Sequence, residues 1–183
     1  MTKQKPEVRS LKCTDIALLV KWLSDPEVLT FYEGRDNRFD KNKVREVFFD
    51  PSNAAQKCIF SYANKPIGYV QYYELENDEK KEFGYESKQQ IYGMDQFIGE
   101  TDYWNKGIGT LLVQTMIQFL KKEKEAEAIV MDPQAWNVRA IRCYEKCGFQ
   151  KVKILPKHEW HEGSYRDCWL MEWRGDAYEN TVT

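Results

Sequence analysis

Histidine is scarce in this sequence, long apolar runs are missing, and neither sign of charge dominates. The 183 residues include two histidines, and 27 basic residues stand against 29 acidic ones, for a net charge of −2. This balance argues against a general nucleic-acid binder, which normally shows a basic excess. No run approaches eighteen apolar residues, so the sequence indicates no membrane-spanning helix. Residues 1–6 carry no apolar stretch of the secretory type, so we expect a cytoplasmic protein.

The five cysteines form no Cys-x-x-Cys motif and no dense disulfide framework. Cys143 and Cys147 are four residues apart, which on a helix places them on one face. We expect two small buried hydrophobic residues there, with a redox or metal pair as the alternative. His158 and His161 lack the further ligands of a zinc site, and we expect them on the surface or in a loop. The sequence therefore predicts no metal centre.

Hydrophobic periodicity predicts one domain over residues 1–174 and a polar tail over 175–183. Strands are expected at 8–12, 56–62, 67–73, 91–98, 128–131, 149–155 and 168–173. Helices are expected at 16–23, 41–49 and 111–120, and a further one is expected after Asn137, a suitable N-cap. Asp25-Pro26 and Gly34 indicate turns, and the acidic run 74–86 indicates a loop. This order predicts an α/β (α+β) fold with a mixed central sheet flanked by helices.

The segment 103–110 (YWNKGIGT) joins a predicted strand to the strongest predicted helix. Two glycines at a helix start let a ligand approach the backbone, and the unpaired N–H groups there favour an anion such as pyrophosphate. A Walker loop would place a lysine after the second glycine, whereas Thr110 stands there. By itself this turn is equally compatible with a plain strand-to-helix connection.

A second segment, 136–149 (WNVRAIRCYEKCGF), follows one strand later. Together the two segments resemble the GNAT superfamily of acetyl-CoA-dependent N-acetyltransferases. The resemblance implies the single-domain GNAT fold, with the glycine turn at the CoA pyrophosphate and the second helix beside the pantetheine arm. The superfamily often has Gln or Arg where this chain has Trp104. We expect that difference to be tolerated, because the turn binds mainly through backbone N–H groups.

Further segments extend the resemblance over almost the whole chain. They are 92–99 (YGMDQFIG), 21–23 (KWL), 31–36 (FYEGRD), 66–69 (PIGY), 132–133 (DP), 161–163 (HEG) and 167–168 (DC). They are similar to the aminoglycoside 6′-N-acetyltransferases, especially the acetyltransferase half of the bifunctional aminoglycoside-modifying enzymes. The resemblance implies direct acetyl transfer from acetyl-CoA to the 6′-amine of an aminoglycoside in a ternary complex, which confers antibiotic resistance.

The resemblance also implies a set of site residues. Asp95 would orient or deprotonate the attacking amine, and Tyr144 would lie beside the thioester sulfur. The residues expected to bind acetyl-CoA are Gln96, Phe97, Ile98, Lys106, Gly107, Ile108, Gly109, Thr110, Asn137 and Tyr144. The residues expected to bind the aminoglycoside are Tyr32, Gln71, Tyr73, Asp78, Asp95, Asp132 and Asp167.

Simple chemistry supports parts of this assignment. A polycationic substrate needs carboxylates, and residues 74–86 hold six acids against two lysines, which would either steer cations or form a solvated loop. An ordinary aspartate titrates at about pH 4, far below an amine, so orientation and electrostatic support suit Asp95 better than strong base catalysis.

Two alternatives share the same cosubstrate motifs. One is a GNAT enzyme acting on a protein N-terminus or a polyamine, and the other is a non-catalytic CoA-binding regulator. The presence of both Asp95 and Tyr144 argues against the regulator, and the acidic positions argue for an aminoglycoside. We expect a monomer whose partners are the antibiotic and acetyl-CoA, with no nucleic acid and no membrane.

Overall fold

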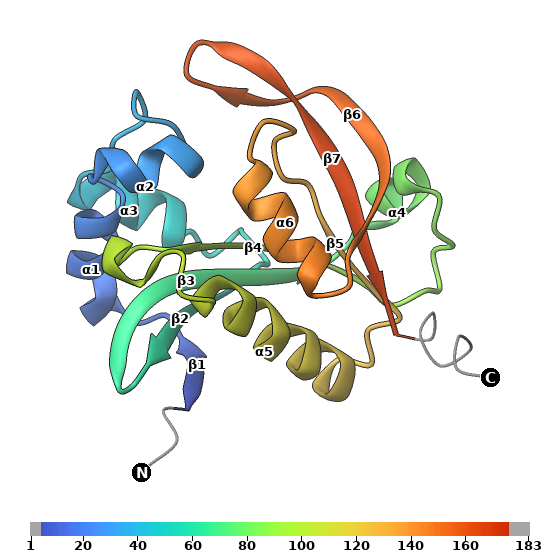
Figure 1. Cartoon of the computed structure of the whole chain (residues 1–183), viewed down its shortest axis with the longest axis horizontal. Helices are drawn as coiled ribbons and strands as arrows, with labels where there is room; N and C mark the ends of the chain where they lie inside the picture. The colour runs from blue at the N-terminus through green and yellow to red at the C-terminus, as the bar shows by residue number, and fades with distance from the viewer. Residues whose placement is uncertain (1–4, 176–183) are drawn as a thin grey trace. The chain divides into compact units, whose positions relative to one another are not determined.

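The computed structural model describes residues 5–175 of the chain. The strands are β1 (Pro6–Ser10), β2 (Gln56–Tyr62), β3 (Lys65–Glu74), β4 (Ile91–Ile98), β5 (Ala128–Met131), β6 (Gln150–His161) and β7 (Ser164–Arg174) (Figure 1). The helices are α1 (Ile16–Trp22), α2 (Pro26–Phe31), α3 (Lys41–Phe48), α4 (Asn77–Phe83), α5 (Ile108–Glu123) and α6 (Val138–Lys146). Short 3-10 turns cover Cys13–Asp15 and Thr101–Tyr103. Apart from Gly175, the predicted tail lies outside the described residues.

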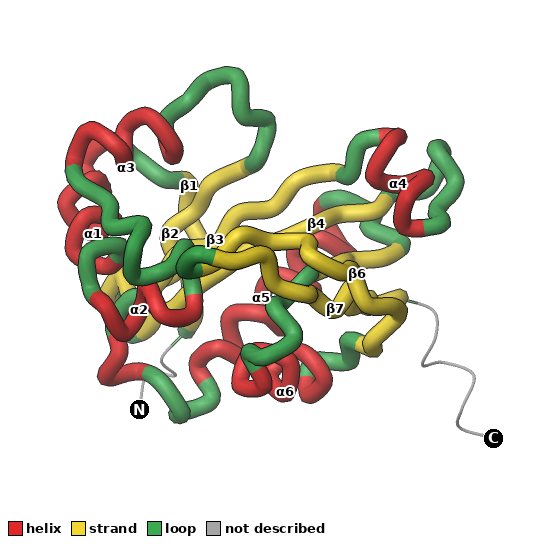
Figure 2. The backbone as a smooth tube through the Cα atoms, turned by 90° about the horizontal axis from the view of Figure 1, so that it is seen from above, coloured by secondary structure: helices red, strands yellow, loops and turns green. Residues whose placement is uncertain are grey.

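The strands form one seven-stranded mixed sheet in the order β1-β2-β3-β4-β5-β7-β6. Strands β1 and β2 are antiparallel, β4 and β5 are parallel, and β5 and β7 are antiparallel again. The parallel pair needs a crossover connection, and α5 supplies it. Figure 2 marks by colour which segments are strands and which are helices. The predicted mixed α/β fold is confirmed.

By backbone contacts the chain groups into two compact units. The first contains the described residues up to 71 together with 95–109 and 160–165, and the second contains 72–94, 110–159 and the described residues from 166. Strands β3, β4, β6 and β7 each contribute to both units. The expected single domain over residues 1–174 stays a prediction.

The core of the first unit is rich in aromatic residues. Trp22 from α1 is fully buried and packs edge-on against Phe97 of β4, with ring centroids 6.1 Å apart. Phe48 from α3 packs edge-on against Tyr69 of β3 at 5.1 Å. Burying each such side chain contributes about 1.5–3 kcal/mol, and the apolar faces of α1 and α3 are spaced to meet this side of the sheet.

The core of the second unit is built around β5, whose four residues are all buried. Ala128 and Val130 cluster with Ile91, Leu170 and other buried residues. Helix α5 contributes the buried side chains Leu112, Val113, Met116, Ile117 and Leu120. A strand buried on both faces reads as a continuous apolar run, which is what made β5 recognisable in the sequence.

Several expectations need correction. Residues 26–31 form helix α2 instead of a turn, because Asp25 accepts a hydrogen bond from the Glu27 N–H at 2.9 Å and Pro26 is preset for a first helical position. Part of the acidic run forms helix α4 instead of a loop. Both histidines lie on β6, and His161 is 4% exposed, so its expected surface or loop position was wrong.

No helix within residues 5–175 combines the length and apolar character needed to cross a bilayer.

Candidate active site

The glycine turn lies where the first unit ends and α5 begins. Asn105 and Gly107 both adopt left-handed backbone conformations, with φ of 58° and 76°. Among the described residues nothing lies within 4 Å of a Cβ built on Gly107, so backbone conformation and open space, not crowding, distinguish this position. Helix α5 is 16 residues long, so its first N–H groups and its dipole suit an anion. The turn therefore fits the pyrophosphate expected from the sequence.

Trp104, the residue that departs from the superfamily pattern, anchors this turn. Its indole N–H donates to the Ile98 carbonyl at 2.9 Å, at the end of β4. Its ring packs edge-on against Phe31, with centroids 5.8 Å apart. The substitution therefore adds a structural contact without removing a backbone N–H group from the turn.

Asp95 is held by a chain of hydrogen bonds across β3 and β4. The Gln71 side-chain amide donates to Asp95 Oδ2 at 2.9 Å, and the Tyr69 hydroxyl donates to Gln71 Oε1 at 2.8 Å. Tyr69 is fully buried, and burial, followed by the Asp95 charge, raises the pKa of its hydroxyl well above the usual range. Tyr69 therefore stays a donor at neutral pH, and the chain orients the Asp95 carboxylate.

The predicted site residues Tyr32 and Phe97 lie side by side. Their ring centroids are 4.6 Å apart, and Phe97 also contacts Trp22 and Tyr69. Because the Phe97 side chain is 8% exposed and belongs to the core, the binding groups it could offer are those of its backbone. Gln96 and Ile98, its neighbours on β4, are only partly buried.

In the second unit, α5 and α6 carry the other expected cosubstrate residues. Asn137 caps α6, as predicted, by accepting from the Ala140 N–H at 3.2 Å. Tyr144 is half-buried beside Phe149, with centroids 6.1 Å apart. Thr110 Oγ1 lies 3.5 Å from Cys143 Sγ. Cys143 and Cys147 are half-buried and hydrogen-bonded, which corrects the expectation of two plain core residues.

Asp132 and Asp167 lie near one another around the buried Cys168. Burial, and then the charges of Glu159, Asp132 and Asp167, raise the pKa of the Cys168 thiol to about 12. Asp167 Oδ1 accepts from the Lys157 N–H at 2.8 Å, which fixes its side chain. The structure thus adds Glu159 to the two predicted acids. Nothing in the local sequence pattern pointed to it.

His158 on β6 is a second residue that the sequence analysis did not place in the site. Its Nε2 lies 2.8 Å from Asp132 Oδ2, and the Asp132 side chain is 41% exposed. The hydrogen bond to Asp132 raises the pKa of His158, with further support from the charges of Glu82 and Glu159. Asp132, which we expected to bind an ammonium group of the antibiotic, is therefore already paired with His158 of the same chain.

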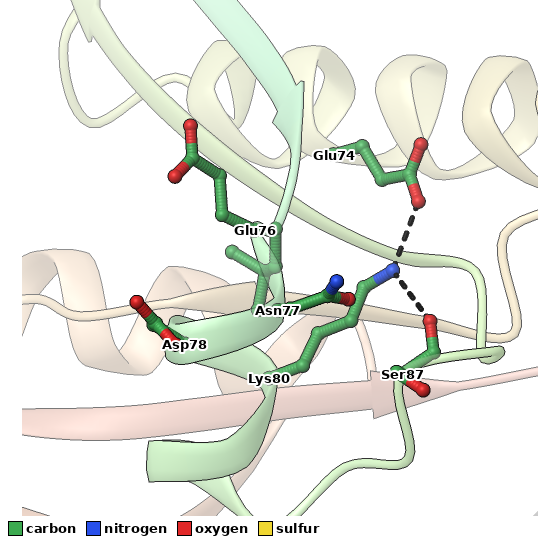
Figure 3. A pocket seen from close by; sticks show the side chains of 7 residues that line it. Glu74, Glu76, Asn77, Asp78, Lys80 and Ser87 are labelled. Carbon is green, nitrogen blue, oxygen red and sulfur yellow. Dashed lines mark hydrogen bonds and ion pairs between the residues drawn. The ribbon is translucent and has the colours of Figure 1, made fainter.

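A polar pocket of about 480 Å³ lies beside α4, lined by Glu74, Leu75, Glu76, Asn77, Asp78, Lys80 and Ser87 (Figure 3). Lys80 is buried, and its ammonium lies 2.9 Å from Glu74 Oε1 and 3.3 Å from the Ser87 carbonyl. Asp78 is exposed in the first turn of α4. Lys80 therefore neutralises part of the negative charge of residues 74–86, through its ion pair with Glu74, whereas Asp78 is exposed to solvent.

Tyr73, the remaining predicted substrate residue, is positioned by a glycine on the neighbouring strand. A Cβ built on Gly93 would lie 2.5 Å from a carbon of the Tyr73 ring. The absence of a side chain at Gly93 leaves the space that the Tyr73 ring occupies. Within residues 5–175, no three His, Cys, Asp or Glu side chains are grouped closely enough to hold a metal ion.

The tip of the β6–β7 hairpin is tied to the loop after α2. The Arg35 guanidinium donates to both carboxylate oxygens of Glu162, at 2.6 and 2.7 Å. This bidentate pair holds the pKa of Glu162 down at about 2. Two segments that carried the sequence resemblance, 31–36 and 161–163, are thus in contact within the first unit.

Comparisons with known proteins show which family the chain belongs to and which proteins it is similar to. A family profile described as an acetyltransferase (GNAT) domain matches residues 12–156. The aminoglycoside N(6′)-acetyltransferase type 1 of Klebsiella pneumoniae is 33% identical over 141 residues, covering 75% of this chain and 70% of that protein.

Solved structures give a similar result. AAC(6′)-Ib in complex with coenzyme A has a TM-score of 0.76 at 25% identity, covering 98% of this chain and 100% of that chain. AAC(6′)-Ib in complex with ribostamycin and coenzyme A has a TM-score of 0.77 at 26% identity, covering 98% of both chains. The likeness therefore extends over both compact units.

Proposed function

The chain belongs to the acetyltransferase (GNAT) family, and we propose that it moves the acetyl group of acetyl-CoA to the 6′-amine of aminoglycoside antibiotics. The observation that carries this proposal is the 33% identity to an aminoglycoside N(6′)-acetyltransferase across three quarters of the chain. Acetylation removes a positive charge from the drug, and resistance follows from that loss. The carboxylates grouped around Cys168 support the same acceptor class, because they suit a polycation.

Acetyl-CoA is bound, in this proposal, by the first turn of α5 and by α6. Lys106, Gly107, Ile108, Gly109 and Thr110 offer backbone N–H groups to the pyrophosphate. The left-handed φ of Gly107 and the open space around it support this assignment. Asn137 and Tyr144 on α6 would contact the pantetheine arm, and the backbone of residues 96–98 would lie along it.

In the transfer step the neutral 6′-amine attacks the thioester carbon, a C–N bond forms, and the C–S bond breaks. Asp95 orients the amine and supports the positive charge that develops on its nitrogen. The hydrogen bond from Gln71 at 2.9 Å limits the positions that the Asp95 carboxylate can adopt, which favours a well-aligned attack. The proton then leaves the nitrogen through Asp95 or through water.

Two other groups share the charge of the transition state. Backbone N–H groups of residues 95–97 would donate to the carbonyl oxygen as it becomes an oxyanion, the term that is usually largest in acyl transfer. Tyr144 would donate to the departing thiolate, whose conjugate thiol has a pKa of about 8.5, so the thiolate needs little help to leave. No cysteine acts as a nucleophile in this scheme.

The antibiotic is held by acids and aromatic rings. Asp132, Asp167 and Asp78 would accept hydrogen bonds from its ammonium groups, each contributing about 1.5–3 kcal/mol. Tyr32, Gln71 and Tyr73 would line the sugar rings. Three such carboxylates suffice for micromolar affinity after the cost of association. We further propose that the protein acts as a cytoplasmic monomer that binds neither nucleic acid nor membrane.

The test is thiol release from acetyl-CoA with matched acceptors. Neomycin and paromomycin differ in carrying an amine or a hydroxyl at the 6′ position, so turnover with neomycin alone establishes the regiochemistry. Spermidine and a basic peptide cover the other GNAT acceptors, and turnover confined to them would reject the aminoglycoside assignment. Asp95→Asn keeps the side-chain shape and is the control for catalysis: we expect kcat to fall at least 100-fold while the melting temperature stays close to that of the wild type.

A further inference from the structure

Glu33 follows the predicted substrate residue Tyr32 and has an unusual backbone conformation. Its φ is 69°, in the left-handed region that residues with a side chain rarely adopt. Gly34, with φ of 98°, completes the turn and donates its N–H to the carbonyl oxygens of Leu29 and Tyr32, both at 2.9 Å. Strained residues of this kind cluster at sites that bind ligands, so the side chain of Glu33 is a candidate for a function.

The Glu33 carboxylate is held in place by the rest of this turn and by α3. The Asn37 side-chain amide donates to Glu33 Oε2 at 2.8 Å. The Lys43 ammonium donates in turn to the Asn37 side-chain oxygen, and it lies 4.6 Å from the centroid of the Phe39 ring. A carboxylate accepts about four hydrogen bonds, so the bond from Asn37 orients Glu33 and leaves acceptor capacity for a ligand.

Ring contacts within the first unit run from Tyr32 to Tyr69. The centroid of the Tyr32 ring lies 4.6 Å from that of Phe97, and Phe97 stacks on Tyr69 at 5.6 Å. Tyr69 is also the first donor of the hydrogen-bonded chain that orients Asp95. The turn that carries Glu33 therefore borders the aromatic cluster to which Asp95 is bonded.

The charges of both carboxylates act on the Tyr69 hydroxyl. Burial raises the pKa of this hydroxyl most, and nearby charges, among them those of Asp95 and then Glu33, raise it further. Because the interaction between charges weakens with distance, the two carboxylates lie in the neighbourhood of the same hydroxyl. Two carboxylates in such proximity suit a ligand with two cationic groups, and the proposed acceptor is a ligand of this kind.

We propose that Glu33 binds a second ammonium group of the acceptor, on the same sugar ring as the amine that is acetylated. This inference rests on the proposed function. Asp95 orients the reacting amine, and Glu33 accepts a hydrogen bond from the other ammonium group, so the ring is held at two points. Aminoglycosides that carry amines at both the 2′ and the 6′ position are then the preferred acceptors.

Kanamycin B and kanamycin A are matched acceptors for the test. Both carry the 6′-amine, and at the 2′ position kanamycin B has an amine where kanamycin A has a hydroxyl. Steady-state kinetics at saturating acetyl-CoA compare the wild type with Glu33→Gln, which keeps an oxygen that accepts from Asn37. We expect the KM for kanamycin B to rise about 10- to 100-fold, the loss of one charge-assisted hydrogen bond, and that for kanamycin A to rise about twofold. An equal rise for both antibiotics overturns the proposal.

Two further variants separate binding from net charge and from folding. Glu27→Gln removes the same charge from an exposed position on α2, so the KM for kanamycin B should stay within about twofold of the wild type. Glu33→Gly suits the left-handed backbone, so its melting temperature should stay within about 4 °C of the wild type, while the KM for kanamycin B rises as in Glu33→Gln. A lower melting temperature with an unchanged KM would reduce Glu33 to a support of the turn and overturn the proposal.

Calorimetry of antibiotic binding to the complex with coenzyme A is independent of turnover, because coenzyme A has no acetyl group to transfer. If kanamycin B binds but is not acetylated, the proposed function fails, whereas its affinity for Glu33→Gln still decides the role of Glu33. If the enzyme acetylates both kanamycins and Glu33→Gln leaves the preference between them unchanged, this inference alone is overturned. If neither kanamycin binds, both fail.

Discussion

His158 Nε2 lies 2.8 Å from Asp132 Oδ2, so the imidazole of β6 occupies a carboxylate that we assign to the substrate. The bond raises the pKa of His158, which means that the imidazolium persists to higher pH than in a free histidine. The pair stabilises the fold fully below the unfolded pKa of ~6.5, and this contribution is lost as pH rises through the folded value. Below that value, an incoming ammonium group must compete with the imidazolium for Asp132.

His158→Gln removes this competing cation. We expect the KM for kanamycin at pH 6 to fall about two- to fivefold, the range expected for a partly exposed ion pair of up to ~1 kcal/mol. At pH 8.5 the difference in KM between the two proteins should be smaller, because less of the wild-type imidazole is protonated there than at pH 6. Steady-state kinetics at both pH values decide the matter. A KM that rises at pH 6 in the variant would mean that His158 contacts the antibiotic directly.

Gln71→Ala tests whether the orientation of Asp95 matters for catalysis. The variant loses the 2.9 Å bond to the carboxylate, and hydrogen bonds to charged groups contribute about 1.5–3 kcal/mol. We expect kcat to fall about 10- to 100-fold. Tyr69→Phe, which removes only the second bond of the chain, is the graded control and should cost less. Unchanged kcat in Gln71→Ala would reduce Gln71 to a contact with the sugar.

Glu100→Gln tests the packing between α1 and the end of β4. Burial would raise the pKa of Glu100, but hydrogen bonds from Lys21 and Trp22, with the charge of Lys65, outweigh burial and lower it to about 2. Because a depressed carboxyl pKa stabilises the fold above the unfolded value of about 4.3, this stabilisation is lost as pH falls towards 2. Urea unfolding should show a loss of about 2–3 kcal/mol at pH 7, shrinking by about half at pH 3. A loss independent of pH would indicate altered packing instead.

The sequence predicted most elements because their local signals agree with their final surroundings. Strands β4 and β5 begin and end where the apolar pattern placed them, and Asn137 caps α6 as expected. The predicted strand ended at Leu155, where Pro156 interrupts the pattern, whereas β6 continues to His161. Proline is tolerated there because β6 is an edge strand of the sheet, and that position depends on topology.

The candidate site likewise contains residues that short sequence motifs predicted and residues that no sequence pattern indicated. Residues that serve a shared cosubstrate are marked by short motifs, such as the glycine turn before α5. Residues that support them come from other strands. Tyr69 donates a hydrogen bond to Gln71, which in turn donates to Asp95. Glu159 and Asp132 are both close to Cys168, which the sequence shows only if the position of β6 in the sheet is known. Such pairs need strand register, and single-sequence patterns do not contain it.

Gly107→Ala tests the assignment of the turn to acetyl-CoA. With φ at 76°, an L-residue at this position pays about 1–2 kcal/mol of conformational strain, and the backbone relieves it by rotating away from the conformation that presents its N–H groups. We expect the KM for acetyl-CoA to rise about fivefold or more, with the KM for the antibiotic unchanged. Gly107→Asn is the matched control, since asparagine adopts left-handed φ more readily and already does so at Asn105 with φ of 58°. Because a Cβ there meets no atom of the described residues within 4 Å, steric overlap cannot explain a difference between the two variants. If both variants raise the KM equally, a side chain at position 107 blocks the ligand itself, and if neither does, the pyrophosphate binds elsewhere.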